Sequence, residues 1–160
     1  MATYHRETRV RAPLEDVLAF HSRIDGLVAL TPSFMGLEID AVRGPDGEPD
    51  PDVLEVGSRI EMTMRPFGVG PSQRWVSVIT ERAERDGAAM FRDVMESGPF
   101  PVWNHAHRFF ADGVETRIVD RVEYELPGGS IGRVASPLGR IGLEPMFRYR
   151  HRRTKELLEA

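Results

Sequence analysis

Apolar residues recur at every second position through much of the chain, which is the pattern of β-strands that bury one face. The clearest case is residues 91–110, where two alternating segments flank a Ser97-Gly98-Pro99 break. This break predicts a hairpin with a turn of about four residues. One face of the hairpin combines large apolar side chains with one carboxylate and two imidazoles: Phe91, Asp93, Met95, Trp103, His105, His107 and Phe109. Such a mixed face indicates the wall of a pocket.

Other segments alternate in the same way and are predicted strands: residues 3–11, 35–41, 59–65, 73–82 and 115–126. The last of them separates its side chains most clearly, because one face is almost wholly charged. The opposite face is apolar apart from one aspartate and consists of Thr116, Ile118, Asp120, Val122 and Tyr124. Residues 44–53 are acidic and rich in proline, which predicts a loop.

Helical spacing of apolar residues appears in three places. Residues 14–21 and 24–30 predict two short helices, and the C-terminal tail predicts a long one. Pro145 either begins this last helix or bends it, and the pattern leaves both open. Arg150 lies on the apolar stripe of the helix, so its cation either reaches solvent or pairs with a carboxylate at the mouth of a cavity. Most of its basic neighbours are expected to be solvated: Arg148, His151, Arg152, Arg153 and Lys155.

Gly128-x-Ser130-x-Gly132 matches the nucleophile-elbow pattern, which follows a strand in a parallel sheet. That chemistry also needs an acid and then a histidine later in the chain. Here the predicted sheet is antiparallel, and only Glu144 and His151 follow. We therefore expect a glycine-rich loop with a capping serine.

The predicted order is a strand, two short helices, six consecutive antiparallel strands and a long final helix. This is an α+β arrangement with a curved seven-stranded sheet, and its 160 residues fit a single domain, 1–160. The apolar face of six strands needs a cover, and the final helix is the only predicted element large enough. A curved sheet that holds a helix leaves space between them for a ligand.

Composition excludes several classes of function. The chain has no cysteine, so it can form neither a disulfide framework nor a thiolate metal site or nucleophile. A net charge of −4 argues against nucleic acid as a partner, since phosphate binding requires a basic face. No apolar run approaches the length of a membrane span, and residues 1–11 lack the apolar segment of a secretory signal. We expect a cytoplasmic protein.

Cross-strand register predicts which polar side chains meet. If the last hairpin turns at Asp112-Gly113, His105 faces Asp120 and His107 faces Ile118. The four-residue turn of the preceding hairpin places Asp93 opposite His105. The wall would then carry a row of Asp93, His105 and Asp120, with His107 as a packing residue.

Three interpretations of this row stay open. It can anchor neighbouring strands as a satisfied polar group, orient a ligand, or supply a general acid and base through His105 and Asp120. Carboxylates raise the pKa of an imidazole and burial lowers it, so the protonation of His105 is not fixed by the sequence. His105-x-His107 with Asp93 or Asp120 also has metal-ligand chemistry, but strand spacing alone is a weak indication. We expect no metal and no other cofactor.

The motif Gly98-Pro99-Phe100-x-x-Trp103-x-His105-x-His107-x-Phe109 resembles the START-like superfamily, also called SRPBCC. More narrowly, the chain resembles the cyclase/dehydrase-like ligand-binding branch, with further matches at Leu30-Thr31-Pro32, Phe91-x-Asp93, Asp120-x-Val122-x-Tyr124 and Phe147-x-Tyr149-Arg150. The resemblance covers essentially the whole chain. It implies a helix-grip fold with a hydrophobic cavity between sheet and final helix, and no metal. It does not fix a reaction.

The expected function is therefore binding of a hydrophobic or aromatic small molecule in that cavity. The apolar wall would consist of Met62, Phe91, Trp103, Val122, Tyr124 and Phe147, and the polar contacts of Asp93, His105 and Asp120. The alternative is a polyketide cyclase/dehydratase-type enzyme that uses His105 as general acid/base. The resemblance also allows an accessory domain that works with an epimerase-like enzyme. A homodimer is compatible with the sequence.

Overall fold

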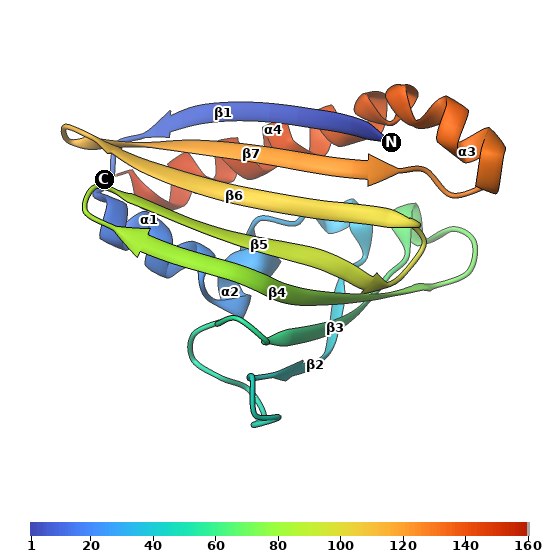
Figure 1. The fold of residues 1–160 in the computed structure, drawn as a ribbon, viewed down its shortest axis with the longest axis horizontal. Helices are drawn as coiled ribbons and strands as arrows, with labels where there is room; N and C mark the ends of the chain where they lie inside the picture. Colours follow the sequence, from blue (N-terminus) through green and yellow to red (C-terminus); the bar gives the residue numbers. More distant parts are fainter. Residues whose placement is uncertain (160) are drawn as a thin grey trace.

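The computed structural model describes residues 1–159 of the chain and is built on a seven-stranded antiparallel sheet (Figure 1). The spatial order of the strands is β1-β7-β6-β5-β4-β3-β2. Their bounds are β1 Ala2–Val10, β2 Glu38–Arg43, β3 Arg59–Met64, β4 Gln73–Arg85, β5 Ala88–Ser97, β6 Val102–Asp112 and β7 Glu115–Glu125. The predicted α+β order is confirmed, because the strands and the helices between and after them follow one another as expected.

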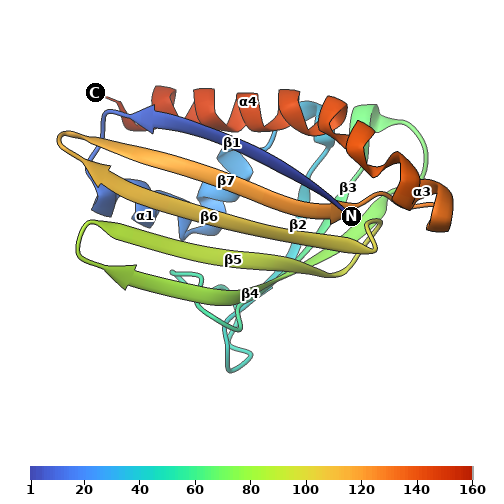
Figure 2. The same cartoon turned by 45° about the horizontal axis from the view of Figure 1, so that its top comes forward.

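Two short helices after β1 and the long C-terminal helix lie on one side of the sheet, and a further short helix lies beyond the end of β7. Figures 1 and 2 show α1, α2 and α4 over the same face, with α4 running alongside β1. The bounds are α1 Leu14–His21, α2 Ile24–Ala29, α3 Gly129–Ala135 and α4 Arg140–Leu158, with short 3₁₀ turns η1 Ser33–Met35, η2 Pro66–Gly68 and η3 Ser136–Gly139. The long C-terminal helix therefore covers the apolar face of the sheet, as predicted.

The segment after β7 corrects one expectation. Gly128-x-Ser130-x-Gly132 is not a loop with a capping serine, because residues 129–135 form helix α3 and Ser130 lies inside it. Gly128 and Gly129 both have positive φ and turn the chain sharply out of β7. Gly132 then packs so closely against the carbonyls of Leu126 and Pro127 that a Cβ would not fit there. The glycines thus serve a tight strand-to-helix turn.

Pro145 lies inside α4, which begins five residues earlier at Arg140. The structure therefore decides the open question: Pro145 does not start the helix. Its ring removes one backbone donor, which would otherwise bond the carbonyl of Ile141. Ile141 is highly exposed, so water can satisfy this carbonyl and the helix continues.

The buried core has two parts. One part lies among helices α1 and α2, strands β2 to β6 and the beginning of β7. It includes Met62, Phe91 and Phe109. The other lies under α4 and consists of Tyr4, Trp103, Val122, Tyr124, Leu143 and Phe147. The predicted inner face of β7 is confirmed by this packing, since all five of its residues, Thr116, Ile118, Asp120, Val122 and Tyr124, are buried.

Two glycines near the start of α4 give a matched test of the packing. A Cβ on Gly139 would lie 2.5 Å from the ring of Tyr124, whose hydroxyl is held by a 2.7 Å hydrogen bond to the Ser136 carbonyl. Gly139→Ala should therefore lower the free energy of unfolding by about 1–3 kcal/mol, the usual cost of overpacking. Gly142→Ala meets no atom within 4 Å and should raise it by up to about 1 kcal/mol. Urea unfolding measures the free energy of unfolding of both variants. Changes of the same sign in the two variants would contradict this packing.

An apolar stripe is exposed at the end of the molecule that carries α3. Ile131, Val134, Leu138 and Ile141 are 64–82% exposed and follow one another at helical spacing. We call these four residues the α3–α4 stripe. No helix of residues 1–159 is both long and apolar enough to cross a membrane.

Candidate ligand pocket

A pocket of about 130 Å³ lies between the sheet, α2 and α4. Its lining is mainly apolar, with Trp75, Phe91, Trp103 and Phe147 as aromatic groups and Met62, Met64 and Met146 as flexible ones. Polar groups reach it from several elements: His21, Ser77, Asp93, His105, His107 and Arg150. An apolar cavity of about 150 Å³ can hold a benzene-sized molecule, so a pocket of about 130 Å³ is comparable in size to one aromatic ring.

Six of the nine residues predicted to contact a ligand border this pocket: Met62, Phe91, Asp93, Trp103, His105 and Phe147. The other three do not. Val122 and Tyr124 lie in the core under α4, where the Tyr124 hydroxyl donates to the backbone of Ser136. Asp120 is buried behind the histidines and contacts them instead of the pocket. These three can shape the site only through the residues they support.

The register of β6 and β7 corrects the predicted polar row. Asp93 does face His105, as expected, but His107 faces Asp120 and His105 faces Val122. The β6–β7 turn is at Gly113-Val114, one residue later than predicted, and this moves the pairing by two residues. His107 is therefore not a packing residue opposite Ile118. It belongs to the polar cluster.

Asp120 is the centre of this cluster. Its Oδ1 accepts a 2.7 Å hydrogen bond from Nε2 of His105, and its Oδ2 accepts a 2.6 Å bond from Nε2 of His151 on α4. Nδ1 of His107 lies 3.4 Å from the same Oδ1. The carboxylate of Asp120 thus ties β7 to β6 and to the C-terminal helix.

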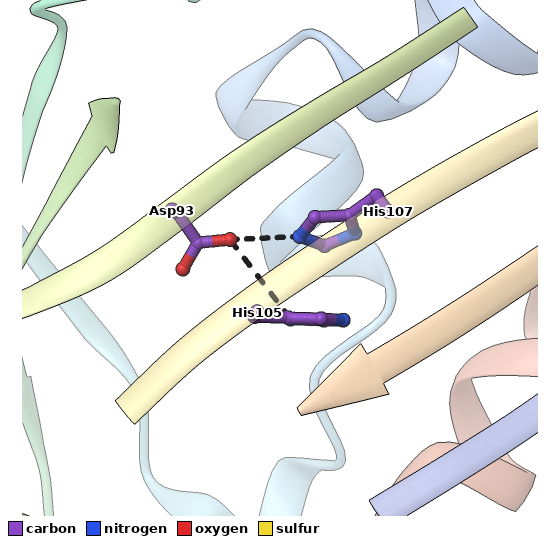
Figure 3. Close-up of side chains that lie close together, drawn as sticks. All are labelled: Asp93, His105 and His107. Carbon is purple, nitrogen blue, oxygen red and sulfur yellow. Dashed lines mark hydrogen bonds and ion pairs between the residues drawn. The ribbon is translucent and has the colours of Figure 1, made fainter. Parts of the chain in front are cut away.

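Asp93 forms the second half of the cluster, on the pocket side. Figure 3 shows its carboxylate directed at both histidines of β6. Oδ1 of Asp93 accepts a 2.7 Å hydrogen bond from Nε2 of His107 and lies 3.9 Å from Nδ1 of His105. Its Oδ2 accepts from the Ser77 hydroxyl at 3.2 Å. His105 and His107 lie ring against ring, with centroids 3.6 Å apart.

The protonation of the cluster follows from burial and these contacts. Burial raises the pKa of Asp120 and of Asp93, but the neighbouring histidines outweigh it and lower both pKa values, well below the usual range for Asp120. Burial and the charge of His107 lower the pKa of His105. Burial also lowers the pKa of His107, but contacts with Asp120 and Asp93 outweigh it and raise that pKa. Of the two histidines on β6, His107 therefore holds a proton more readily, and His105 favours the neutral form.

His151 was missed by the sequence reasoning, which placed it among solvated basic residues. It is buried and hydrogen-bonded to Asp120. Its position held a signal, because it follows Phe147 by four residues and precedes Thr154 by three, and both of these are buried on the inner face of α4.

Known proteins were compared at the level of sequence and of structure. No protein-family model matches the chain, and no curated protein gives a significant match. Solved structures do match it over nearly its full length. The START superfamily protein from Mycobacterium smegmatis is 16% identical, with a TM-score of 0.62 over 97% of this chain and 98% of that one. This chain has the START-like fold.

Two further solved structures share this fold over nearly the full length of the chain. TTHA0849 from Thermus thermophilus is 19% identical, with a TM-score of 0.63 over 96% of this chain and 97% of that one. Norcoclaurine synthase from Thalictrum flavum, solved in complex with dopamine and hydroxybenzaldehyde, is 17% identical, with a TM-score of 0.65 over 99% and 87%. At these identities the likeness extends to the fold, so the site has to be interpreted from its own residues.

Asp93, His105 and His107 also have the chemistry of a cation site in this START-like fold. One oxygen and two nitrogens of theirs lie within 4.8 Å of one another (Figure 3). Two imidazoles and a carboxylate suit a divalent transition metal. Against this, Oδ1 of Asp93 and Nε2 of His107 already satisfy each other through a 2.7 Å hydrogen bond. The absence of a metal stays a prediction.

Two basic residues outside the cluster, His21 and Arg150, also border the pocket. His21 of α1 donates through Nδ1 to the Val17 carbonyl at 2.8 Å, and burial lowers its pKa to about 3, so it is neutral. Arg150 of α4 also borders the pocket, with its Cζ 5.9 Å from the centre of the Phe147 ring. Sequence reasoning singled out Arg150 from its place on the apolar stripe but left its partner open.

Proposed function

We propose that this START-like protein binds a hydrophobic or aromatic small molecule in the pocket between the sheet, α2 and α4. The observation that carries the proposal is the lining itself, in which apolar and aromatic side chains surround a few polar groups. Ligand sites generally have this composition, because apolar walls supply affinity and a few polar groups fix orientation.

The aromatic groups are arranged to accept a flat molecule. Trp75 and Trp103 meet edge to face, with ring centroids 5.2 Å apart and an interplanar angle of 83°. Phe91 stacks on His107 at 4.1 Å, so another part of the lining also presents flat rings. Aromatic pairs gain about 0.5–1.5 kcal/mol beyond the area they bury, and a ligand ring would gain similarly. The three methionines can adjust to its outline.

Asp93, His105 and His107 would supply orientation. Their polar atoms lie in one part of the lining, so a ligand with one polar end and one apolar end would bind in a single direction. Ser77 holds the second oxygen of Asp93 and limits its rotation. A positioned, hydrogen-bonded cluster of this kind loses little entropy when a ligand arrives.

The cyclase/dehydratase-type alternative rests on His105. This imidazole borders the pocket, and its Nε2 donates to Asp120, which leaves Nδ1 as the basic nitrogen. A general base needs such a fixed tautomer within reach of a substrate. The lowered pKa of His105 suits a base that is neutral near pH 7. Binding is the simpler proposal, because it requires no reaction that the residues do not specify.

Extraction of the purified protein with denaturing solvent, followed by mass spectrometry, tests the proposal. We expect release of an apolar small molecule that is absent from an equal amount of a variant whose pocket is narrowed by Leu27→Phe and Met64→Phe. Both side chains line the pocket and are only partly buried, so larger ones can be accommodated by filling it. The proposal would be overturned if the wild-type extract contained no such molecule and the wild-type protein also failed to bind added trans-cinnamamide.

A further inference from the structure

Arg150 differs from Arg148, Arg152 and Arg153, its neighbours in α4. Arg148 pairs with Glu144, and Arg152 and Arg153 pair with Glu156, all on the outer side of the helix. Within residues 1–159, no ion pair and no hydrogen bond of its guanidinium joins Arg150 to another residue, although it is half-buried and borders an apolar pocket. Burial lowers its pKa, yet a guanidinium stays charged at neutral pH. The guanidinium therefore has no counter-ion in direct contact, although the charges of Asp120 and Asp93 act on it from a distance and oppose the lowering of its pKa.

The nearby carboxylates are already occupied. Asp93 accepts from His107 and Ser77, and its contact with His107 raises the pKa of that imidazole. Asp120 accepts from His105 and His151 and does not line the pocket, although its charge still raises the pKa of Arg150. His21 and His105 are neutral because burial lowers their pKa values. Among the charged side chains that border the pocket, Arg150 is therefore the one whose charged group has no hydrogen-bonded partner within residues 1–159.

We propose that the ligand carries a carboxylate that pairs with Arg150, while its aromatic body packs against Trp75, Trp103 and Phe147. This inference rests on the proposed function, since it names the class of ligand for the same pocket. The planar guanidinium offers two parallel N–H donors that match the two oxygens of a carboxylate. A phosphate would bring more charge and more acceptors than one arginine can satisfy. Desolvation of the pair inside an apolar pocket strengthens the contact.

Binding of two nearly isosteric probes tests this directly. Trans-cinnamate and trans-cinnamamide share a single ring and a three-carbon arm, and they differ in the charge of the end group. NMR titration measures both, because the chain has only two tryptophans and both border the pocket, so their indole N–H signals report occupancy. We expect the wild-type protein to bind cinnamate roughly tenfold to a hundredfold more tightly than the amide, as for a charge-assisted hydrogen-bonded pair.

Variants assign the preference to one residue. Arg150→Gln should reduce the ratio of cinnamate affinity to cinnamamide affinity to about one, while the cinnamamide affinity itself changes less than about twofold. Arg150→Lys should restore part of the preference for cinnamate. Arg152→Gln removes the same charge from the outer side of α4 and should keep the wild-type preference. Urea unfolding of each variant confirms that it is folded.

The outcomes separate the two proposals. Suppose that cinnamamide binds, but the wild-type protein shows no preference for cinnamate or Arg150→Gln retains that preference. Arg150 is then not the counter-ion of a carboxylate, and this inference fails while the proposed function stands. If neither probe shifts the two indole signals, the pocket does not take aromatic molecules of this size and the proposed function fails with it.

Discussion

Asp120→Ala is expected to lower the free energy of unfolding by about 3–5 kcal/mol, because it leaves the Nε2–H groups of His105 and His151 buried without an acceptor. Domains of this kind are stable by only about 5–15 kcal/mol, so the loss is a large fraction of the total. Asp120→Asn keeps one acceptor oxygen and should fall between wild type and Asp120→Ala. Urea unfolding at neutral pH measures the series.

The effect of pH has a defined sign. Because its neighbours hold the pKa of Asp120 well below its unfolded value of about 3.9, the ionised carboxylate stabilises the native state above that pH. This stabilisation is lost as the pH falls through the lowered native pKa. The difference between wild type and Asp120→Ala should therefore be largest at neutral pH and shrink below about pH 4.

Asp112→Ala is the matched control. Asp112 is an exposed carboxylate of β6 that pairs with Arg9, and surface pairs contribute about 0–1 kcal/mol. If the free energy of unfolding of Asp120→Ala lies within about 1 kcal/mol of the wild-type value, the histidines find other partners. The central role of Asp120 in the cluster would then be wrong.

Much of the fold follows from alternation along the chain. The face of each strand in the last two hairpins was predicted correctly, including Asp93, His105 and Asp120 on the inner side. This held even though the β6–β7 register was wrong by two residues, since side chains alternate with a period of two and an even shift preserves the face. The partners changed, however. Gly113 takes the left-handed conformation at the first position of the turn, and the sequence alone could not choose between Asp112-Gly113 and Gly113-Val114.

The composition of the site was harder to predict than its location. Helical periodicity allows both Arg150 and His151 to face inward, and a basic run around them favoured solvent for most of its members. Only packing shows that His151 reaches Asp120 while Arg150 borders the pocket. Packing also keeps Val122 and Tyr124 out of the pocket. At their end of the sheet, α4 and η3 cover the strands, and side chains occupy the space between them. Helix α3 was missed although Ile131 and Val134 recur at helical spacing, because the glycines around Ser130 favoured a loop.

Narrowing the pocket should weaken binding of an aromatic probe by roughly tenfold or more, an effect of about 1.4 kcal/mol or larger. Leu27→Phe and Met64→Phe place two additional rings in a space of about 130 Å³, from α2 and from β3. A ligand ring would then have to displace well-packed side chains, which costs about 1–3 kcal/mol. Leu157→Phe adds a ring to an exposed part of α4 and should leave affinity unchanged.

The exposed α3–α4 stripe requires a second control, because it could hold an apolar probe without any pocket. Replacing Ile131 and Val134 by serine removes half of its apolar side chains. The affinity of trans-cinnamamide should not respond to this change if the probe enters the pocket.

NMR titration of trans-cinnamamide against the wild-type protein and the Leu27→Phe/Met64→Phe variant shows whether the pocket holds an aromatic molecule. We expect saturable shifts of the Trp75 and Trp103 indole signals in wild type, with affinity reduced roughly tenfold or more in the variant. Equal affinity in both proteins, or shifts that vanish when the α3–α4 stripe is changed, would contradict binding in this pocket.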